Sequence, residues 1–81
     1  MRYFGAARAA VGMDEERLPA GRSVDELLAA LRERPPVPGA PSLGRVLDRS
    51  SFLLNEVALR DTSTTLADGD VVDVLPPFAG G

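Results

Sequence analysis

The sequence predicts a single α+β domain in which a mixed sheet of about five strands packs on one main helix. Three observations lead to this prediction. One clearly bounded amphipathic helix follows Ser23, and short strand-like segments stand before and after it in the chain. The length of 81 residues leaves room for one domain with one small core.

The first twenty residues predict two short strands around a helical turn. Residues 1–4 end in two aromatic residues, which favour extended structure. The alanine-rich segment 5–11 predicts one or two helical turns that end at Gly12, since it is too short for an independent helix. We expect residues 14–18 to form a second strand, although acidic residues disfavour strands. Pro19-Ala20-Gly21 predicts a turn.

The main helix has clear signals at both ends. Ser23 begins it, and Glu26, three residues later, completes a capping box. Two arginines near Arg34 favour the negative end of the helix dipole, and Pro35-Pro36 forbid continuation. The apolar residues at helical spacing are Val24, Leu27, Leu28 and Leu31. They form one buried face, so we interpret this segment as the core helix.

The segment after this helix is proline-rich. Residues 35–41 hold four of the seven prolines and predict a stiff connecting loop. A proline-recognising partner is the alternative reading of this loop. Residues 42–48 then predict a short helix capped by Ser42.

The last third of the chain predicts three strands. Residues 51–54 and 57–59 read as a hairpin around the tight turn Asn55-Glu56, since asparagine tolerates positive φ. Residues 61–65 are a turn-rich link, and 70–75 form the final strand. Asp68-Gly69-Asp70 lacks the remaining ligands of a calcium loop and is read as a turn.

The order of elements predicts a β-grasp, or ubiquitin-like, arrangement. A right-handed crossover places the last strand parallel to the first, in the middle of the sheet. We therefore expect a β-grasp domain over residues 1–75 and a flexible C-terminal tail over 76–81 that projects from the sheet.

Composition argues against several classes of function. The net charge is −3 and the basic residues form no block, which argues against nucleic-acid binding. No apolar run approaches the roughly 20 residues of a membrane span, and these features favour a cytoplasmic protein. Cysteine, histidine and lysine are all absent. The usual nucleophiles, general bases and thiolate metal ligands are therefore missing, and we expect no metal site, no bound cofactor and no catalysis by this chain alone.

The C-terminal tail is the candidate reactive segment. Pro76 and Pro77 end the strand and hold the tail away from the body, and Phe78 can anchor it on a partner. Gly80 and Gly81 can thread a channel too narrow for any Cβ, so the reactive group would be the Gly81 α-carboxylate. The alternative is an ordinary frayed terminus, in which glycine is common.

The chain resembles the MoaD/ThiS family of ubiquitin-like sulfur carriers over essentially its whole length, and within it most closely the molybdopterin synthase branch. The ending Pro76–Gly81 is the specific likeness, because a bare Gly-Gly is a weak signal. The other likenesses are Arg2-Tyr3-Phe4 with Ala7-Arg8 and Gly12, residues 18–21, Ser23-Val24 through Leu31, Asn55, and residues 66–72. A short first strand and the proline loop 35–41 depart from the family pattern, and neither touches the tail.

The resemblance implies a mechanism for the tail. An E1-like adenylating enzyme would use ATP and Mg²⁺ to activate the Gly81 carboxylate, and a sulfur donor would convert it to a thiocarboxylate. The tail, with Ala79 and Gly80 threading the channel, would then enter the large subunit of molybdopterin synthase and pass sulfur to cyclic pyranopterin monophosphate. The candidate partner surface comprises Phe4, Leu59, Leu75, Pro76, Pro77 and Phe78. Alternatively, Phe4, Leu59 and Leu75 are simply core residues.

Other functions remain open at the level of sequence. The chain can be read as a sulfur carrier for thiamine or cysteine biosynthesis. It can also be read as a ubiquitin-like binding module whose tail is never activated, or as a protein modifier joined through Gly81 to lysines of other proteins. The binding module predicts that Gly81 is dispensable, whereas a carrier cannot function without it.

Overall fold

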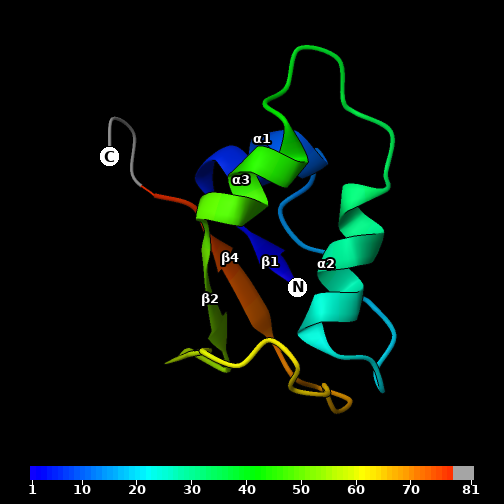
Figure 1. The fold of residues 1–81 in the computed structure, drawn as a ribbon, viewed down its shortest axis with the longest axis vertical. Coiled ribbons are helices and arrows are strands. Elements are labelled where there is room, and N and C mark those ends of the chain that lie inside the picture. Colours follow the sequence, from blue (N-terminus) through cyan, green and yellow to red (C-terminus); the bar gives the residue numbers. More distant parts are fainter. Residues whose placement is uncertain (78–81) are drawn as a thin grey trace.

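The computed structural model describes residues 1–77 and shows an α+β domain (Figure 1). In chain order the elements are β1 (Arg2–Tyr3), α1 (Gly5–Val11), α2 (Val24–Arg32), α3 (Leu43–Arg49), β2 (Ser51–Leu54), β3 (Val57–Ala58) and β4 (Val72–Leu75). No helix among the described residues is both long and apolar enough to cross a membrane.

As predicted, the last strand lies in the middle of the sheet. The strand order is β1-β4-β2-β3, with β4 parallel to β1 and antiparallel to β2. The pairs Arg2↔Asp73 and Tyr3↔Val74 join β1 to β4, and the pair Ser51↔Leu75 lies where β2 begins. The parallel pairing of the first and last strands confirms the crossover that the element order predicted.

Within residues 1–77 the sheet contains four strands, and the prediction of a strand over residues 14–18 is wrong. This segment makes only an isolated antiparallel bridge, Arg2↔Glu15. The Tyr3 amide donates to the Asp14 carbonyl at 2.8 Å, and the Glu16 amide donates to the Met1 carbonyl at 3.0 Å. The run of three carboxylates disfavours strand structure, and pairing does not continue beyond it.

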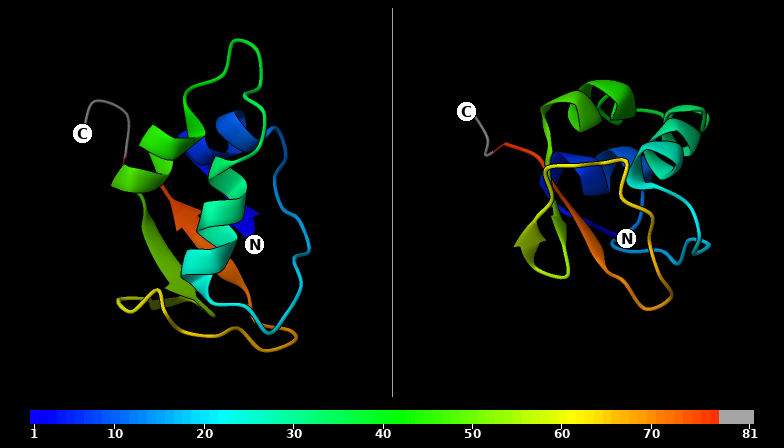
Figure 2. Two further views of the ribbon diagram at one scale, coloured as in Figure 1. Left: turned by 45° about the vertical axis from the view of Figure 1, so that its right-hand side comes forward. Right: turned by 60° about the horizontal axis from the view of Figure 1, so that its bottom comes forward.

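The helices cover one face of the sheet, as the views in Figure 2 show. The α2 capping box is confirmed: the Glu26 amide donates to the Ser23 hydroxyl, and the Ser23 amide donates to the Glu26 carboxylate. The helix ends at Arg32, two residues before the predicted end. The buried cluster consists of Tyr3, Ala7, Val24, Leu27, Leu28, Leu31, Leu47, Leu66, Val72 and Val74.

Two element ends differ from the sequence prediction. Ser42 precedes α3, but its side chain makes no cap hydrogen bond, and its carbonyl accepts from the Val46 amide. The strand β4 begins at Val72, because the Asp70 carboxylate accepts from the Ala67 amide and closes the turn before it. The predicted end of α1 at Gly12 is confirmed by its left-handed φ of 88°.

A charged network ties β1 to the end of α2. Tyr3 is 2% exposed, and its hydroxyl donates to the Glu16 carboxylate. The Arg34 guanidinium reaches both Glu16 oxygens, at 2.9 and 3.0 Å. Burial opposes ionisation of Glu16, but the hydrogen bonds from Arg34 and Tyr3 prevail and lower its pKa.

Because of this network, part of the free energy of unfolding should depend on pH in the acidic range. A carboxyl whose pKa is lower in the folded state stabilises the fold above its unfolded pKa, and this contribution is lost as pH falls through the folded pKa. We expect Glu16→Gln to cost about 1 kcal/mol at neutral pH, and the cost to shrink below the ordinary glutamate pKa of 4.5. Urea unfolding across this range measures both effects. Glu15→Gln, a change at an exposed neighbour, is the control, and equal acid sensitivity of Glu16→Gln and wild type would contradict the prediction.

The β2–β3 turn combines one favourable and one unfavourable residue. Asn55 and Glu56 have φ values of 49° and 70°. The Asn55 side chain donates to Asp70 at 3.0 Å and accepts from the Val71 amide at 2.9 Å, which joins the hairpin to the start of β4. Glu56 also has a left-handed φ, which is costly for a residue with a Cβ. Unlike Asn55, it makes no side-chain hydrogen bond among the described residues that would offset this cost.

We therefore expect Glu56→Gly to stabilise the protein by about 0.5–1 kcal/mol, because Asn-Gly is the favoured pair for this turn. Asn55→Gly is the matched variant: it also relaxes φ but removes two hydrogen bonds, so it should destabilise. Thermal unfolding of both variants is the measurement, and a shift in the same direction for both would refute this account of the turn.

Candidate functional site

The candidate site lies where the chain leaves the sheet after β4. Val74 is fully buried, Leu75 and Pro76 are partly buried, and Pro77 is exposed. The chain thus passes from the centre of the core to solvent within four residues, a change that the two prolines reinforce because they cannot donate to a ladder. Of the predicted site residues, Phe78, Ala79, Gly80 and Gly81 lie outside the described residues.

Both strands beside β4 end their pairing at the level of Leu75. On one side, the Phe4 amide donates to the Val74 carbonyl at 3.3 Å, and the chain then turns into α1 at Gly5. On the other side, Ser51 opposite Leu75 is the first residue of β2, directly after α3. The segment that follows Leu75 therefore leaves the sheet between the turn into α1 at Gly5 and the junction of α3 with β2.

The other predicted partner residues have different environments. Phe4 is 41% exposed and lies next to the point where the tail leaves the sheet. Leu59 is partly buried and packs against the core cluster, so its side chain contributes mainly to folding. Leu75 is partly buried and lies on the face of the sheet opposite the buried Val74, since successive side chains of a strand alternate.

The sheet face that carries Leu75 is the face without a helix in the described part of the chain (Figure 2). We call it the uncovered sheet face, and the pairing register assigns to it Arg2, Ser51, Leu53, Ala58, Asp73 and Leu75. The sequence prediction missed Leu53. Its place opposite Asp73 and Ala58 follows from strand pairing, for which a single sequence gives no local signal.

An ion pair lies at the centre of the uncovered sheet face. The Arg2 Nε and Nη2 atoms donate to the two carboxylate oxygens of Asp73 at 2.5 and 2.7 Å. Asp73 is only 4% exposed although no helix covers it, because the Arg2 side chain lies over it. This bidentate geometry fixes the register of the two-residue strand β1 on β4.

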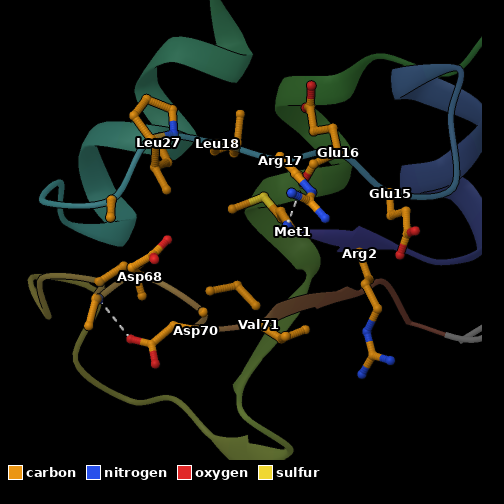
Figure 3. A pocket seen from close by; sticks show the side chains of 16 residues that line it. Met1, Arg2, Glu15, Glu16, Arg17, Leu18, Leu27, Asp68, Asp70 and Val71 are labelled. Atoms are coloured by element: carbon orange, nitrogen blue, oxygen red, sulfur yellow. Dashed lines mark hydrogen bonds between the residues drawn. The ribbon is translucent and has the colours of Figure 1, made fainter.

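A separate groove of about 820 Å³ lies at the other end of β4, beside Met1 (Figure 3). It is lined by residues 15–20 and 66–72, together with Met1, Arg2 and Leu27. Its charged lining residues include Glu15, Arg17, Asp68 and Asp70. Because β4 points its C-terminal end away from this groove, the groove and the base of the tail are distinct features.

The chemistry available in the described residues is limited. Across residues 1–77, no group of three or more Asp, Glu, His or Cys side chains is arranged to hold a metal ion. Every buried side-chain nitrogen or oxygen in the same range has a hydrogen-bond partner, so none is left free for a ligand. The C-terminal carboxylate, which the sequence predicted as the reactive group, lies outside the described residues.

Known proteins resemble this chain in sequence and structure over nearly its full length. The molybdopterin synthase sulfur carrier subunit of Chlamydomonas reinhardtii is 32% identical over 82 residues, which cover 98% of this chain and 93% of the relative. A chain in the complex of subunits 1 and 2 of molybdopterin-converting factor from Helicobacter pylori superposes with a TM-score of 0.68 and 30% identity, covering 99% of this chain and 93% of that one.

A second solved structure supports the β-grasp architecture. SAMP1 from Haloferax volcanii matches with a TM-score of 0.67 and 24% identity, over 99% of this chain and 94% of that one. The model of the ThiS family matches residues 1–81, which is the full sequence. The chain belongs to the ThiS family.

Proposed function

We propose that this chain is the sulfur carrier subunit of a molybdopterin synthase and that the Gly81 carboxylate carries the sulfur. The observation that supports this most directly is the full-length similarity to the Chlamydomonas reinhardtii subunit, at 32% identity. The sequence ends in Gly80-Gly81 after a buried central strand, which suits a carrier whose own C-terminus reacts.

The proposed chemistry needs an activating enzyme, because a carboxylate is a poor electrophile. The Gly81 carboxylate attacks the α-phosphorus of ATP, releases pyrophosphate and becomes an acyl adenylate. A sulfur donor then attacks the acyl carbon, AMP departs with the bonding electrons, and a thiocarboxylate remains. An E1-like enzyme uses ATP and Mg²⁺ and supplies the acid-base groups, which fits the lack of histidine, cysteine and lysine in this chain.

The thiocarboxylate then donates its sulfur to cyclic pyranopterin monophosphate in the large subunit of the synthase. In this proposal Gly80 and Ala79 pass through a narrow channel of that subunit, where side chains at these positions must stay small. Phe78, with Pro76 and Pro77, anchors the tail at the channel entrance. We place this reaction in the cytoplasm.

The surface proposed to bind the large subunit is the uncovered sheet face together with Phe4. Leu53 and Leu75 offer apolar area beside the Arg2–Asp73 pair, and Phe4 adds an exposed aromatic ring close to the tail. Aromatic side chains are enriched at protein interfaces, so the exposed Phe4 is the strongest of these candidates. The similar Helicobacter pylori chain is itself part of a complex of two subunits, which supports a protein partner of this kind.

The deciding experiment is intact-mass measurement of the full chain after incubation with an E1-like activating enzyme, ATP, Mg²⁺ and sulfide. We expect a gain in mass equal to replacement of one oxygen by sulfur, followed by molybdopterin formation when the large subunit and the pterin substrate are added. Sulfur transfer to a thiazole synthase or to a cysteine precursor in place of the pterin would reassign the pathway. No gain in mass with several competent activating enzymes would favour the non-activated binding module.

A further inference from the structure

We propose that two copies of this chain associate through β3, pairing antiparallel so that their two four-stranded sheets join into one sheet of eight strands. This association does not depend on the proposed function, since it concerns the free protein and no other partner. Three features support it: an open edge at β3, free backbone groups on that edge, and an order of charges along residues 56–60 that is complementary to itself.

The two edges of the sheet differ in their protection. At one edge β1 is covered by residues 14–16, which make backbone hydrogen bonds to Met1 and Tyr3 at 3.0 and 2.8 Å. At the other edge β3, yellow-green in Figure 1, has no strand beyond it within residues 1–77. Open edges are the places where another strand can add, and proteins commonly protect them with lysine or proline. Apart from its shortness β3 has no such protection, because residues 57–59 include neither.

The backbone groups of Ala58 point out of the sheet. The Leu59 amide donates to the Phe52 carbonyl at 2.9 Å, so these two residues form a hydrogen-bonded pair of the β2–β3 ladder. In an antiparallel ladder such pairs alternate with non-hydrogen-bonded ones, and Leu53↔Ala58 is of the second kind. The Ala58 amide and carbonyl therefore face away from β2, and neither has a hydrogen-bond partner among the described residues. Since Ala58 is exposed, both groups are available to a second strand.

The charges of this segment complement themselves. In an antiparallel pair centred on Ala58, the two copies of Ala58 exchange both of their hydrogen bonds, and residue 56 of each copy lies opposite residue 60 of the other. This register sets Glu56 against Arg60 twice in each dimer. Opposite charges in facing positions stabilise a strand pair, and like charges destabilise it. Both side chains are exposed, and neither forms an ion pair within residues 1–77.

The same register gives Val57 an apolar neighbour. Its side chain is 68% exposed, which is the largest exposure of any large apolar residue in the described part of the chain. In the dimer Val57 lies opposite Leu59 of the other copy, at a non-hydrogen-bonded position, where facing side chains approach most closely. Leu59 already packs against the core cluster, so Val57 would extend that apolar contact across the two copies.

Pairing through β3 also closes the assembly. Because β3 ends the strand order β1-β4-β2-β3, the combined sheet has only the two β1 edges on its outside, and residues 14–16 cover each of them. Among the described residues no open edge remains for a third copy. The two-fold axis stands perpendicular to the sheet, so both uncovered sheet faces lie on the same side. Since β4 runs parallel to β3, the two Leu75 residues lie at opposite ends of the combined sheet.

Charge reversal tests this register. Glu56→Arg places arginine opposite arginine at both positions, and Arg60→Glu places carboxylate opposite carboxylate. The double variant, Glu56→Arg with Arg60→Glu, restores both pairs with their charges exchanged. An equimolar mixture of the two single variants restores them as well, but only between unlike chains. The control is Glu33→Arg, which makes the same change in net charge at an exposed residue after α2.

Sedimentation equilibrium of the full chain at up to about 1 mM gives the dissociation constant of the dimer, in a range that includes weak interfaces. We expect each single variant to weaken association about tenfold or more, since two attractive pairs become two repulsive ones. The double variant and the mixture should return close to wild type, and Glu33→Arg should change little. Added salt should reduce the differences between variants, because exposed charges are screened.

Hydrogen exchange of the wild-type chain locates the contact without any substitution. The Ala58 amide is free in the monomer and hydrogen-bonded in the dimer, so its exchange with solvent should slow as the protein concentration rises. The Leu59 amide, which is already bonded to Phe52, is the internal reference and should respond less. This measurement decides the matter alone if a charge variant fails to fold.

The proposal is overturned if the wild-type chain stays monomeric across this range, or if the double variant associates as weakly as the single ones. Slower exchange at other amides with none at Ala58 would place the dimer contact on a different surface and overturn it too. A monomeric chain whose binding to the large subunit is weakened by Glu56→Arg would assign the β3 edge to that partner in place of a second copy.

Discussion

Deletion of Gly81 is expected to abolish thiocarboxylate formation and to leave the free energy of unfolding unchanged. The deletion leaves a carboxylate on Gly80, but this group lies one residue, about 3.5 Å, short of its proper reach. A displacement of about 1 Å from the reacting geometry already costs about 100-fold in rate. Intact mass after incubation with the activating enzyme, ATP and sulfide measures the loss, and urea unfolding checks the fold.

Two further variants distinguish the effect of tail length from the effect of channel width. Gly81→Ala keeps the length of the tail and adds one Cβ, so it reports whether the channel is too narrow for a side chain. A chain with one extra glycine after Gly81 keeps the tail thin but moves the carboxylate outward by the same 3.5 Å or so. If the shortened chain still gains sulfur at the wild-type rate, Gly81 is not the reacting residue. If it still supports the biological role without gaining sulfur, the non-activated binding module is favoured.

The elements that the sequence predicted well are those with local signals. The start of α2 depends on Ser23 and Glu26, three residues apart, and on apolar residues within two helical turns, so a short window contains everything that determines it. The hairpin turn at Asn55 is local in the same sense. The central place of β4 was also predictable, because rules on chain crossover restrict the possible topologies.

The features that the sequence did not predict depend on pairing between distant residues. The Arg2–Asp73 ion pair joins residues 71 positions apart, and only the register of β1 on β4 brings them together. Residues 14–18 looked like a strand but make one bridge, because strand identity depends on the neighbour as much as on propensity. The place of Leu53 on the uncovered sheet face likewise depends on strand pairing between distant residues.

The largest expected effect on stability comes from the strand that carries the tail. Val74 is fully buried in the central strand β4, whereas Val57 in the edge strand β3 is 68% exposed. Val74→Ala and Val57→Ala remove the same two methyl groups from strands, so the difference between them isolates burial. We expect Val74→Ala to cost about 2–3 kcal/mol and Val57→Ala less than about 0.5 kcal/mol.

In a domain of this size, the Val74→Ala loss corresponds to a fall in melting temperature of about 10–20 °C. Thermal unfolding followed by circular dichroism measures both variants, and equal shifts would mean that β4 is not the centre of the core. Val74 lies two residues before Pro76, and its carbonyl accepts from the Phe4 amide. A cavity at this position should therefore loosen the base of the tail as well, and sulfur loading of Val74→Ala should decline before global unfolding begins. The strand that is best buried among the described residues is thus also the strand that leads into the proposed reactive end.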